Sequence, residues 1–139
     1  CTSRKYEQVN GIEKFGSINP IIVGKHGGKN NLNKLLESLN RSKLLTKKIE
    51  KWRPDLLISF CSPEASRVAY GLGIPHIAFS DSPHATAVMK LSLPYVTKLL
   101  IPWIIPKEDV KEFGINYTNI IKYRAIDAGV IIKNYKINK

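Results

Sequence analysis

Short apolar runs and stretches with helical spacing alternate along this chain. Continuous apolar character predicts β-strands, and these runs span residues 18–23, 56–61, 76–79, 98–101 and 120–123. Apolar residues three and four positions apart predict helices, which span residues 32–52, 64–72, 83–93 and 106–113. Strands that are separated by helices of this length indicate βαβ units and a mainly parallel sheet. The pattern therefore predicts a doubly wound α/β fold.

Local signals mark the ends of the longest helix. Asn30 or Asn31 can cap its start, and Pro54 ends it, because the residue before a proline is pushed out of the helical region. Trp52 and Phe60 are large and apolar, and we expect both in the core.

The size and the ends of the chain bear on its organisation. Residues 2–5 are polar, which predicts a loop entered from an upstream segment, and residues 129–139 follow no clear pattern. A length of 139 residues suits one domain, and neither a repeat nor a low-complexity linker divides it. We therefore expect a single domain over residues 1–139, as a fragment of a longer protein.

Composition and charge narrow the class of protein. The two cysteines, Cys1 and Cys61, are too few for a disulfide framework or a zinc site. Neither an apolar run of membrane-helix length nor a signal peptide is present, so we expect a cytoplasmic protein. The formal net charge of +11 can attract anionic partners, including nucleic acid, although a solvated, lysine-rich surface explains the same charge.

Polar, ionisable and glycine residues concentrate in the turns that follow the predicted strands. These turns are residues 24–28, 62–64 and 80–84, whereas the turns at the opposite strand ends are plain. Ligands of an open parallel sheet bind beyond the carboxyl ends of its strands. We therefore expect the three turns to converge on one cleft.

The first of these turns precedes the long helix and suits an anion. A helix N-terminus attracts negative charge, and the turn would bring backbone N–H groups and positive charge to a phosphate through Lys25, His26, Gly27 and Gly28. The spacing of known phosphate-binding loops is absent, so a flexible turn with solvated lysines is an equal interpretation. His26 is either an acid–base group or simply exposed.

The second turn places a carboxylate at the start of a helix. Ser62 can cap that helix and Glu64 suits its positive end, so a good helix start explains both residues. In the functional alternative, Glu64 faces the cleft and Arg67 fixes the carboxylate or binds a phosphate.

The third turn holds an acid and a histidine. We expect Ser82 to cap the helix 83–93, with Asp81 at the strand end and His84 in the first helical turn. There the helix would keep the imidazole neutral and Asp81 could orient it, as a general base requires. A capped helix with an exposed histidine is the alternative. Glu64, Asp81 and His84 are thus the candidate catalytic residues.

Four strings carry a resemblance to domain-of-unknown-function family 354: GKHGG at 24–28, SPEA at 62–65, GLGIP at 71–75 and DSPHA at 81–85. Proteins of this family are similar to the amino-terminal half of GT-B-type glycosyltransferases and of UDP-N-acetylglucosamine 2-epimerases. The resemblance implies a Rossmann-like fold that lacks its first strand and helix and a whole second domain. Similar epimerases carry acidic residues at positions that match Glu64 and Asp81, but the surrounding motifs differ, so no reaction carries over.

Two functions follow as expectations. The resemblance implies a protein that binds or acts on a nucleotide-sugar or sugar-phosphate, like a glycosyltransferase or an epimerase. No cofactor is expected, and the three histidines lack the paired spacing of metal ligands. The alternative is a non-enzymatic basic module that binds nucleic acid or another anionic partner. A sheet that lacks a strand also has an unpaired edge, which predicts self-association through that edge.

Overall fold

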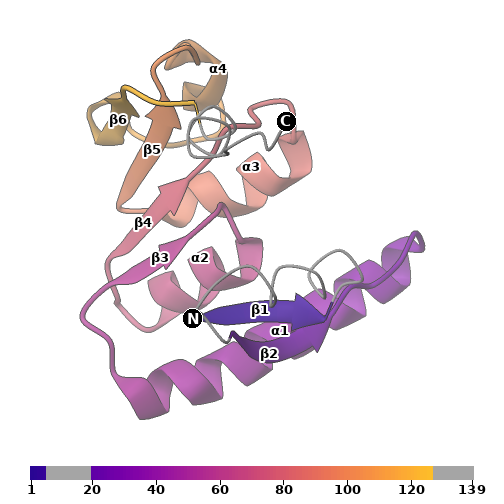
Figure 1. Ribbon diagram of the computed structural model, residues 1–139. Coiled ribbons are helices and arrows are strands. Elements are labelled where there is room, and N and C mark those ends of the chain that lie inside the picture. Colours follow the sequence, from indigo (N-terminus) through magenta and orange to yellow (C-terminus); the bar gives the residue numbers. More distant parts are fainter. Residues whose placement is uncertain (6–19, 127–139) are drawn as a thin grey trace, which may run out of the picture. The chain divides into compact units, whose positions relative to one another are not determined.

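A computed structural model describes residues 1–5 and 20–126 and divides the chain into two compact units, Cys1–Pro54 and Asp55–Lys139 (Figure 1). In the described residues the paired strands are parallel, and strands alternate with helices over most of the chain. This is an α/β fold of the doubly wound, Rossmann-like class, as predicted. The single domain over residues 1–139 stays a prediction, and each unit is described by itself.

In the first unit, β1 (Thr2–Lys5) pairs in parallel with β2 (Ile21–Lys25). The Ile21 N–H donates to the Cys1 carbonyl at 3.0 Å. The loop predicted for residues 2–5 is therefore wrong, because a strand pairs through its backbone and polar side chains do not prevent it. β2 begins later than the predicted strand 18–23, whose first two residues lie outside the described residues.

The helix α1 (Asn31–Trp52) is the predicted long helix. The Asn30 side chain accepts the Asn33 N–H and caps the helix, as predicted. The buried residues of α1 lie in its middle and its second half, namely Arg41, Leu45 and Ile49. The leucines of the first half are more than half exposed, namely Leu32, Leu35, Leu36 and Leu39.

The second unit is built on a four-stranded parallel sheet in the order β3-β4-β5-β6. Its strands are β3 (Leu57–Ser59), β4 (His76–Phe79), β5 (Lys98–Pro102) and β6 (Ile120–Tyr123). Its helices are α2 (Pro63–Gly71), α3 (Thr86–Ser92), η3 (Leu93–Tyr95), α4 (Glu108–Lys111) and η4 (Tyr117–Asn119). Because sequence neighbours are also sheet neighbours, the sheet grows by one crossover at a time.

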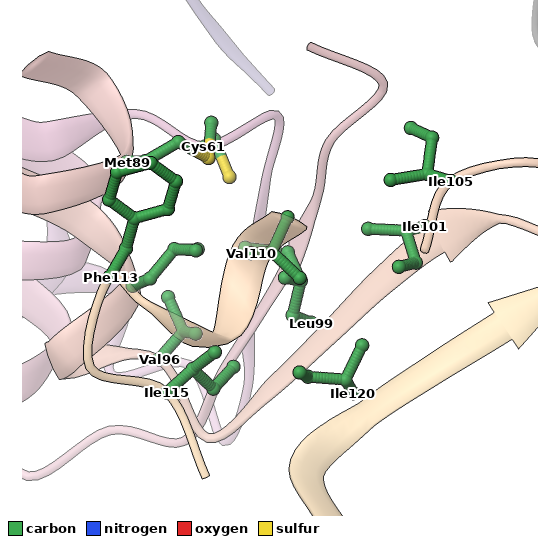
Figure 2. Close-up of a cluster of buried hydrophobic side chains, with 12 residues drawn as sticks. Cys61, Met89, Val96, Leu99, Ile101, Ile105, Val110, Phe113, Ile115 and Ile120 are labelled. Atoms are coloured by element: carbon green, nitrogen blue, oxygen red, sulfur yellow. The ribbon is translucent and has the colours of Figure 1, made fainter. Parts of the chain in front are cut away.

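The core of the second unit lies between one face of this sheet and its helices. Figure 2 labels buried side chains of β5 and β6, namely Leu99, Ile101 and Ile120. They belong to one cluster with Met89 of α3 and Val110 of α4. Buried and less buried residues alternate along β4 and along residues 98–101 of β5, and this alternation shows which face the helices cover.

The other face of this sheet is partly open. Ile58 of β3 is 62% exposed and Ile121 of β6 is 45% exposed. Phe60 is 60% exposed, and Trp52 in the first unit is 48% exposed, so both core predictions are wrong. Apolar character alone does not show which face of an element another layer covers.

Candidate functional site

The turns that follow β3 and β4 lie next to each other in the second unit. The two strands are neighbours, with Ser59 in register with Ala78, so the chain leaves both strands at the same end of the sheet. The Cys61 thiol forms a hydrogen bond with Ser80, and the Ser92 hydroxyl donates to the Cys61 carbonyl at 3.2 Å. The Cys61–Ser80 contact therefore joins the two turns, and Ser92 ties the first turn to the end of α3.

Cys61 forms a strained turn at this end of the sheet. Its φ of 42° lies in the left-handed region, which is costly for a residue with a Cβ. β3 therefore ends at Ser59, earlier than predicted, and the chain turns directly into α2. Burial raises the pKa of the Cys61 thiol to about 11, although the hydrogen bond with Ser80 lowers it. The thiol is protonated at neutral pH and is not an activated nucleophile.

Ser62 and Glu64 form a rigid start to α2. The Ser62 hydroxyl accepts the Ala65 N–H at 3.3 Å, which confirms the predicted cap, and donates to Glu64 Oε2 at 2.9 Å. Glu64 is only 4% exposed, and its carboxylate lies in the first turn, where a helix favours negative charge. Arg67, predicted to fix this carboxylate or bind a phosphate, lies exposed on α2.

The turn after β4 differs from the prediction. α3 begins at Thr86, and its N-cap Ala85 makes no side-chain hydrogen bond, so the expected cap at Ser82 is wrong. The Ser82 hydroxyl instead donates to Asp81 Oδ1 at 2.7 Å, and the Ala85 N–H donates to the Ser82 carbonyl at 3.0 Å, which closes a tight turn. His84 lies in that turn before the helix, not in the first helical turn as expected. Asp81 and His84 are both exposed.

The glycine turn belongs to the first unit and packs on the start of α1. A Cβ on Gly27 would lie 2.5 Å from the backbone of α1, so only glycine allows this approach. Gly28 has a φ of 70°, and its N–H donates to His26 Nδ1 at 3.0 Å. Lys25 Nζ lies 3.4 Å from Glu37 Oε1, an acid of α1 that competes with any phosphate. The phosphate contact and the cleft shared with the other two turns stay predictions.

A buried polar pair in the second unit has no signal in the sequence. Ser59 Oγ lies 2.9 Å from His76 Nε2 and also accepts the Ser62 N–H at 3.3 Å. Burial lowers the pKa of His76 to about 4, so the ring is neutral at physiological pH. The pair ties β4 to β3 beneath the turn, and its residues, 17 positions apart, meet only through the parallel register.

The exposed side chains of the turn after β4 can form hydrogen bonds with a ligand. Asp81 presents an exposed carboxylate, and His84 presents an exposed imidazole three residues later.

In residues 1–5 and 20–126, no group of three or more histidine, cysteine, aspartate or glutamate side chains is placed to hold a metal ion. No helix in the described part of the chain is long and apolar enough to span a bilayer.

Comparisons with known proteins give a family without an assigned activity. A family model described as "Protein of unknown function (DUF354)" matches residues 1–138. "Uncharacterized protein MJ0665" of Methanocaldococcus jannaschii is 40% identical over 93 residues, which cover 66% of this chain and only 27% of that relative. The chain therefore matches well under half the length of this curated relative. No solved structure matches the chain.

Proposed function

This chain belongs to the DUF354 family, and from that premise we propose that it binds a sugar phosphate, or the sugar part of a nucleotide-sugar, through the turns after β3 and β4. One observation carries the proposal. Neighbouring parallel strands deliver two carboxylates, each hydrogen-bonded to a serine hydroxyl, to the same end of one sheet. Carboxylate oxygens accept several hydrogen bonds each, which suits a ligand rich in hydroxyl groups.

The two carboxylates have different roles in this proposal. Asp81 is exposed, so it contacts the sugar hydroxyls directly. Glu64 is almost buried and bonded to Ser62, so it holds the serine and the start of α2 in place. His84 follows Asp81 on the exposed turn and is the candidate proton acceptor.

The likeness to the amino-terminal half of GT-B-type glycosyltransferases and sugar-nucleotide epimerases is part of the proposal. In those enzymes the nucleotide binds mainly to a second domain, and the first domain contributes the acceptor face and some catalytic residues. The match covers only 27% of the curated relative, so the rest of that protein is long enough to hold a further domain. A transferase-like or epimerase-like activity would then belong to the whole protein rather than to this segment.

Isothermal titration calorimetry tests the binding, with N-acetylglucosamine 1-phosphate and UDP-N-acetylglucosamine as probes. Asp81→Asn is expected to weaken binding of the sugar phosphate about tenfold or more, because hydrogen bonds to a charged group are lost. The matched control is Asp55→Asn, which neutralises an exposed carboxylate before β3, at the opposite end of the strand, and should leave binding unchanged. Absence of binding to both probes, or an equal loss in both variants, contradicts the proposal.

A second candidate function is favoured by the surface of α1. Exposed lysines lie along this helix, at positions Lys34, Lys43, Lys47 and Lys51, in a chain of net charge +11. Such a surface suits nucleic acid or another anionic polymer. If four phosphates are neutralised, affinity for double-stranded DNA should fall about a hundredfold between about 50 and 200 mM salt, whereas sugar-phosphate binding should change much less. Filter binding at the two salt concentrations separates the candidates.

A further inference from the structure

Ser80 is the last buried residue before the exposed turn that follows β4. It comes directly after Phe79, where the strand ends, and is only 2% exposed. Its N–H donates to the Leu100 carbonyl of β5 at 3.1 Å, so its backbone is fixed to the neighbouring strand. Asp81, the next residue, is exposed. The chain therefore passes from the rigid sheet to the candidate ligand-binding turn at Ser80.

The hydroxyl of Ser80 forms the three hydrogen bonds that a hydroxyl can form, because it has one proton and can accept two further bonds. It donates to Met89 Sδ of α3 at 3.9 Å and accepts the Ser82 N–H at 3.4 Å. Since its one proton is directed at Met89, the protonated Cys61 thiol is the donor in the bond between Cys61 and Ser80. The oxygen is thus held by α3, by the turn after β3 and by its own turn.

These contacts reach the carboxylate of Asp81 through Ser82. The backbone N–H of Ser82 is held by Ser80, and the Ser82 carbonyl accepts the Ala85 N–H at 3.0 Å. The hydroxyl of Ser82 donates to Asp81 Oδ1 at 2.7 Å. The orientation of the exposed carboxylate therefore depends on a residue whose own backbone is fixed from the buried side.

We propose that Ser80 is a positioning residue for ligand binding, whose buried hydroxyl sets the orientation in which Asp81 meets the hydroxyl groups of a sugar phosphate. The inference rests on the proposed function of the two turns. Ser80 does not touch the ligand and acts through Ser82. Cys61 supports the same oxygen from the neighbouring turn, so its thiol contributes to binding as a hydrogen-bond donor rather than as a nucleophile. Affinity is gained because a group that is already ordered loses less freedom on binding.

Isothermal titration with N-acetylglucosamine 1-phosphate, at a temperature at which each variant is folded, tests the proposal. Ser80→Ala is expected to weaken binding about fivefold or more, because the turn that carries Asp81 must then be ordered by the ligand. The matched control is Thr97→Val, which removes a hydroxyl that accepts the His76 N–H at 3.0 Å, before β5 and thus at the opposite end of the sheet. This variant should bind like the unmodified chain. A merely structural role of Ser80 would lower the free energy of unfolding but leave the affinity of the folded chain unchanged.

A pair of variants at Cys61 tests the support from the neighbouring turn, and decides the matter if Ser80→Ala does not fold. Cys61→Ala removes the donor to Ser80 and is expected to weaken binding about threefold. Cys61→Ser keeps a donor at the same position and should restore most of the affinity. Alanine and serine meet the same left-handed backbone, so the difference between the two variants reports the hydrogen bond.

Asp81→Asn separates this inference from the proposed function. If it weakens binding whereas Ser80→Ala and Cys61→Ala do not, the positioning role is wrong and the proposed function stands. If Asp81→Asn has no effect, or the unmodified chain does not bind the probe, both fail. Equal weakening by Ser80→Ala and Thr97→Val also overturns the positioning role. Hydrogen exchange at the Ser82 amide needs no ligand: faster exchange is expected in Ser80→Ala, and unchanged protection overturns the proposal.

Discussion

Two Ser-Pro dipeptides follow neighbouring strands of the same sheet, and only one of them begins a helix. After Ser62-Pro63, the Ser66 N–H donates to the Ser62 carbonyl at 2.9 Å, and α2 follows at once. After Ser82-Pro83, the chain forms a tight turn, and α3 begins only at Thr86. The same dipeptide thus gives two local structures, so its neighbours decide the outcome.

The position of the nearby acid distinguishes the two turns. Glu64 follows its serine, so the Ser62 hydroxyl is held over the first turn of α2. Asp81 precedes its serine, so the Ser82 hydroxyl is drawn back toward the strand end and caps nothing. The first turn is consequently buried and rigid, whereas the second presents an exposed carboxylate that a ligand can reach.

The largest expected effect is that acid destabilises the protein through the buried His76–Ser59 pair below the turn after β3. His76 is bonded to Ser59 below the first turn, and burial lowers its pKa from 6.5 to about 4. Between these values the unfolded chain binds a proton that the folded chain does not, so the free energy of unfolding falls as the pH falls. At about 1.4 kcal/mol for each pH unit, the loss between about pH 7 and about pH 4.5 is about 2.5 kcal/mol. Urea unfolding at about pH 7 and about pH 4.5 measures it.

Two histidine variants separate this effect from the titration of carboxylates. His76→Gln keeps a hydrogen-bonding group but does not titrate, so the variant should lose the histidine share of the pH dependence. His84→Gln changes an exposed histidine and should retain the full pH dependence. If both variants lose stability with acid as the unmodified chain does, the buried imidazole is not the cause.

Removing the carboxylate of each turn in separate variants is expected to have a smaller effect on the free energy of unfolding. Glu64→Ala is expected to lower the free energy of unfolding by about 2 kcal/mol, because it removes a buried, charged hydrogen-bond partner from Ser62. Asp81→Ala removes an exposed carboxylate and should cost less than about 0.5 kcal/mol. Urea unfolding of both variants at neutral pH measures the difference. Equal losses would mean that the two turns do not differ in rigidity.

The parts of the fold that depend on local pattern could be predicted from the sequence. β4 and β6 lie at the predicted residues, because short, mainly apolar runs bounded by turn residues mark strands. α1 begins one residue before its predicted start and ends where predicted. β1 could not be predicted, since it pairs through backbone groups and its polar side chains give no sequence signal of that pairing. The early end of β3 rests on the left-handed backbone of Cys61, which a residue other than glycine rarely adopts.

The candidate site shows the same limit. The cap at Ser62 was predictable because a cap joins residues only three positions apart. The contacts of Cys61 with Ser80 and of Ser59 with His76 join distant residues, and they exist only because β3 and β4 are parallel neighbours in a particular register. Sequence pattern therefore indicated which turns matter, but not how each is held.

The smallest expected effect concerns the hydroxyl of Ser62. Ser62→Ala removes both the acceptor of the Ala65 N–H and the donor to Glu64, and should lower the free energy of unfolding by at least about 1 kcal/mol. Ser82→Ala removes the same atom from the same dipeptide, where it caps no helix, and should cost less than about 0.5 kcal/mol. Because the two deletions are chemically identical, the difference between their urea midpoints reports the cap together with the buried bond to Glu64. A loss of equal size in both variants would mean that the bond from Ser82 to Asp81 supports its turn as strongly as Ser62 supports α2, and the contrast between a rigid turn and an accessible one would fail.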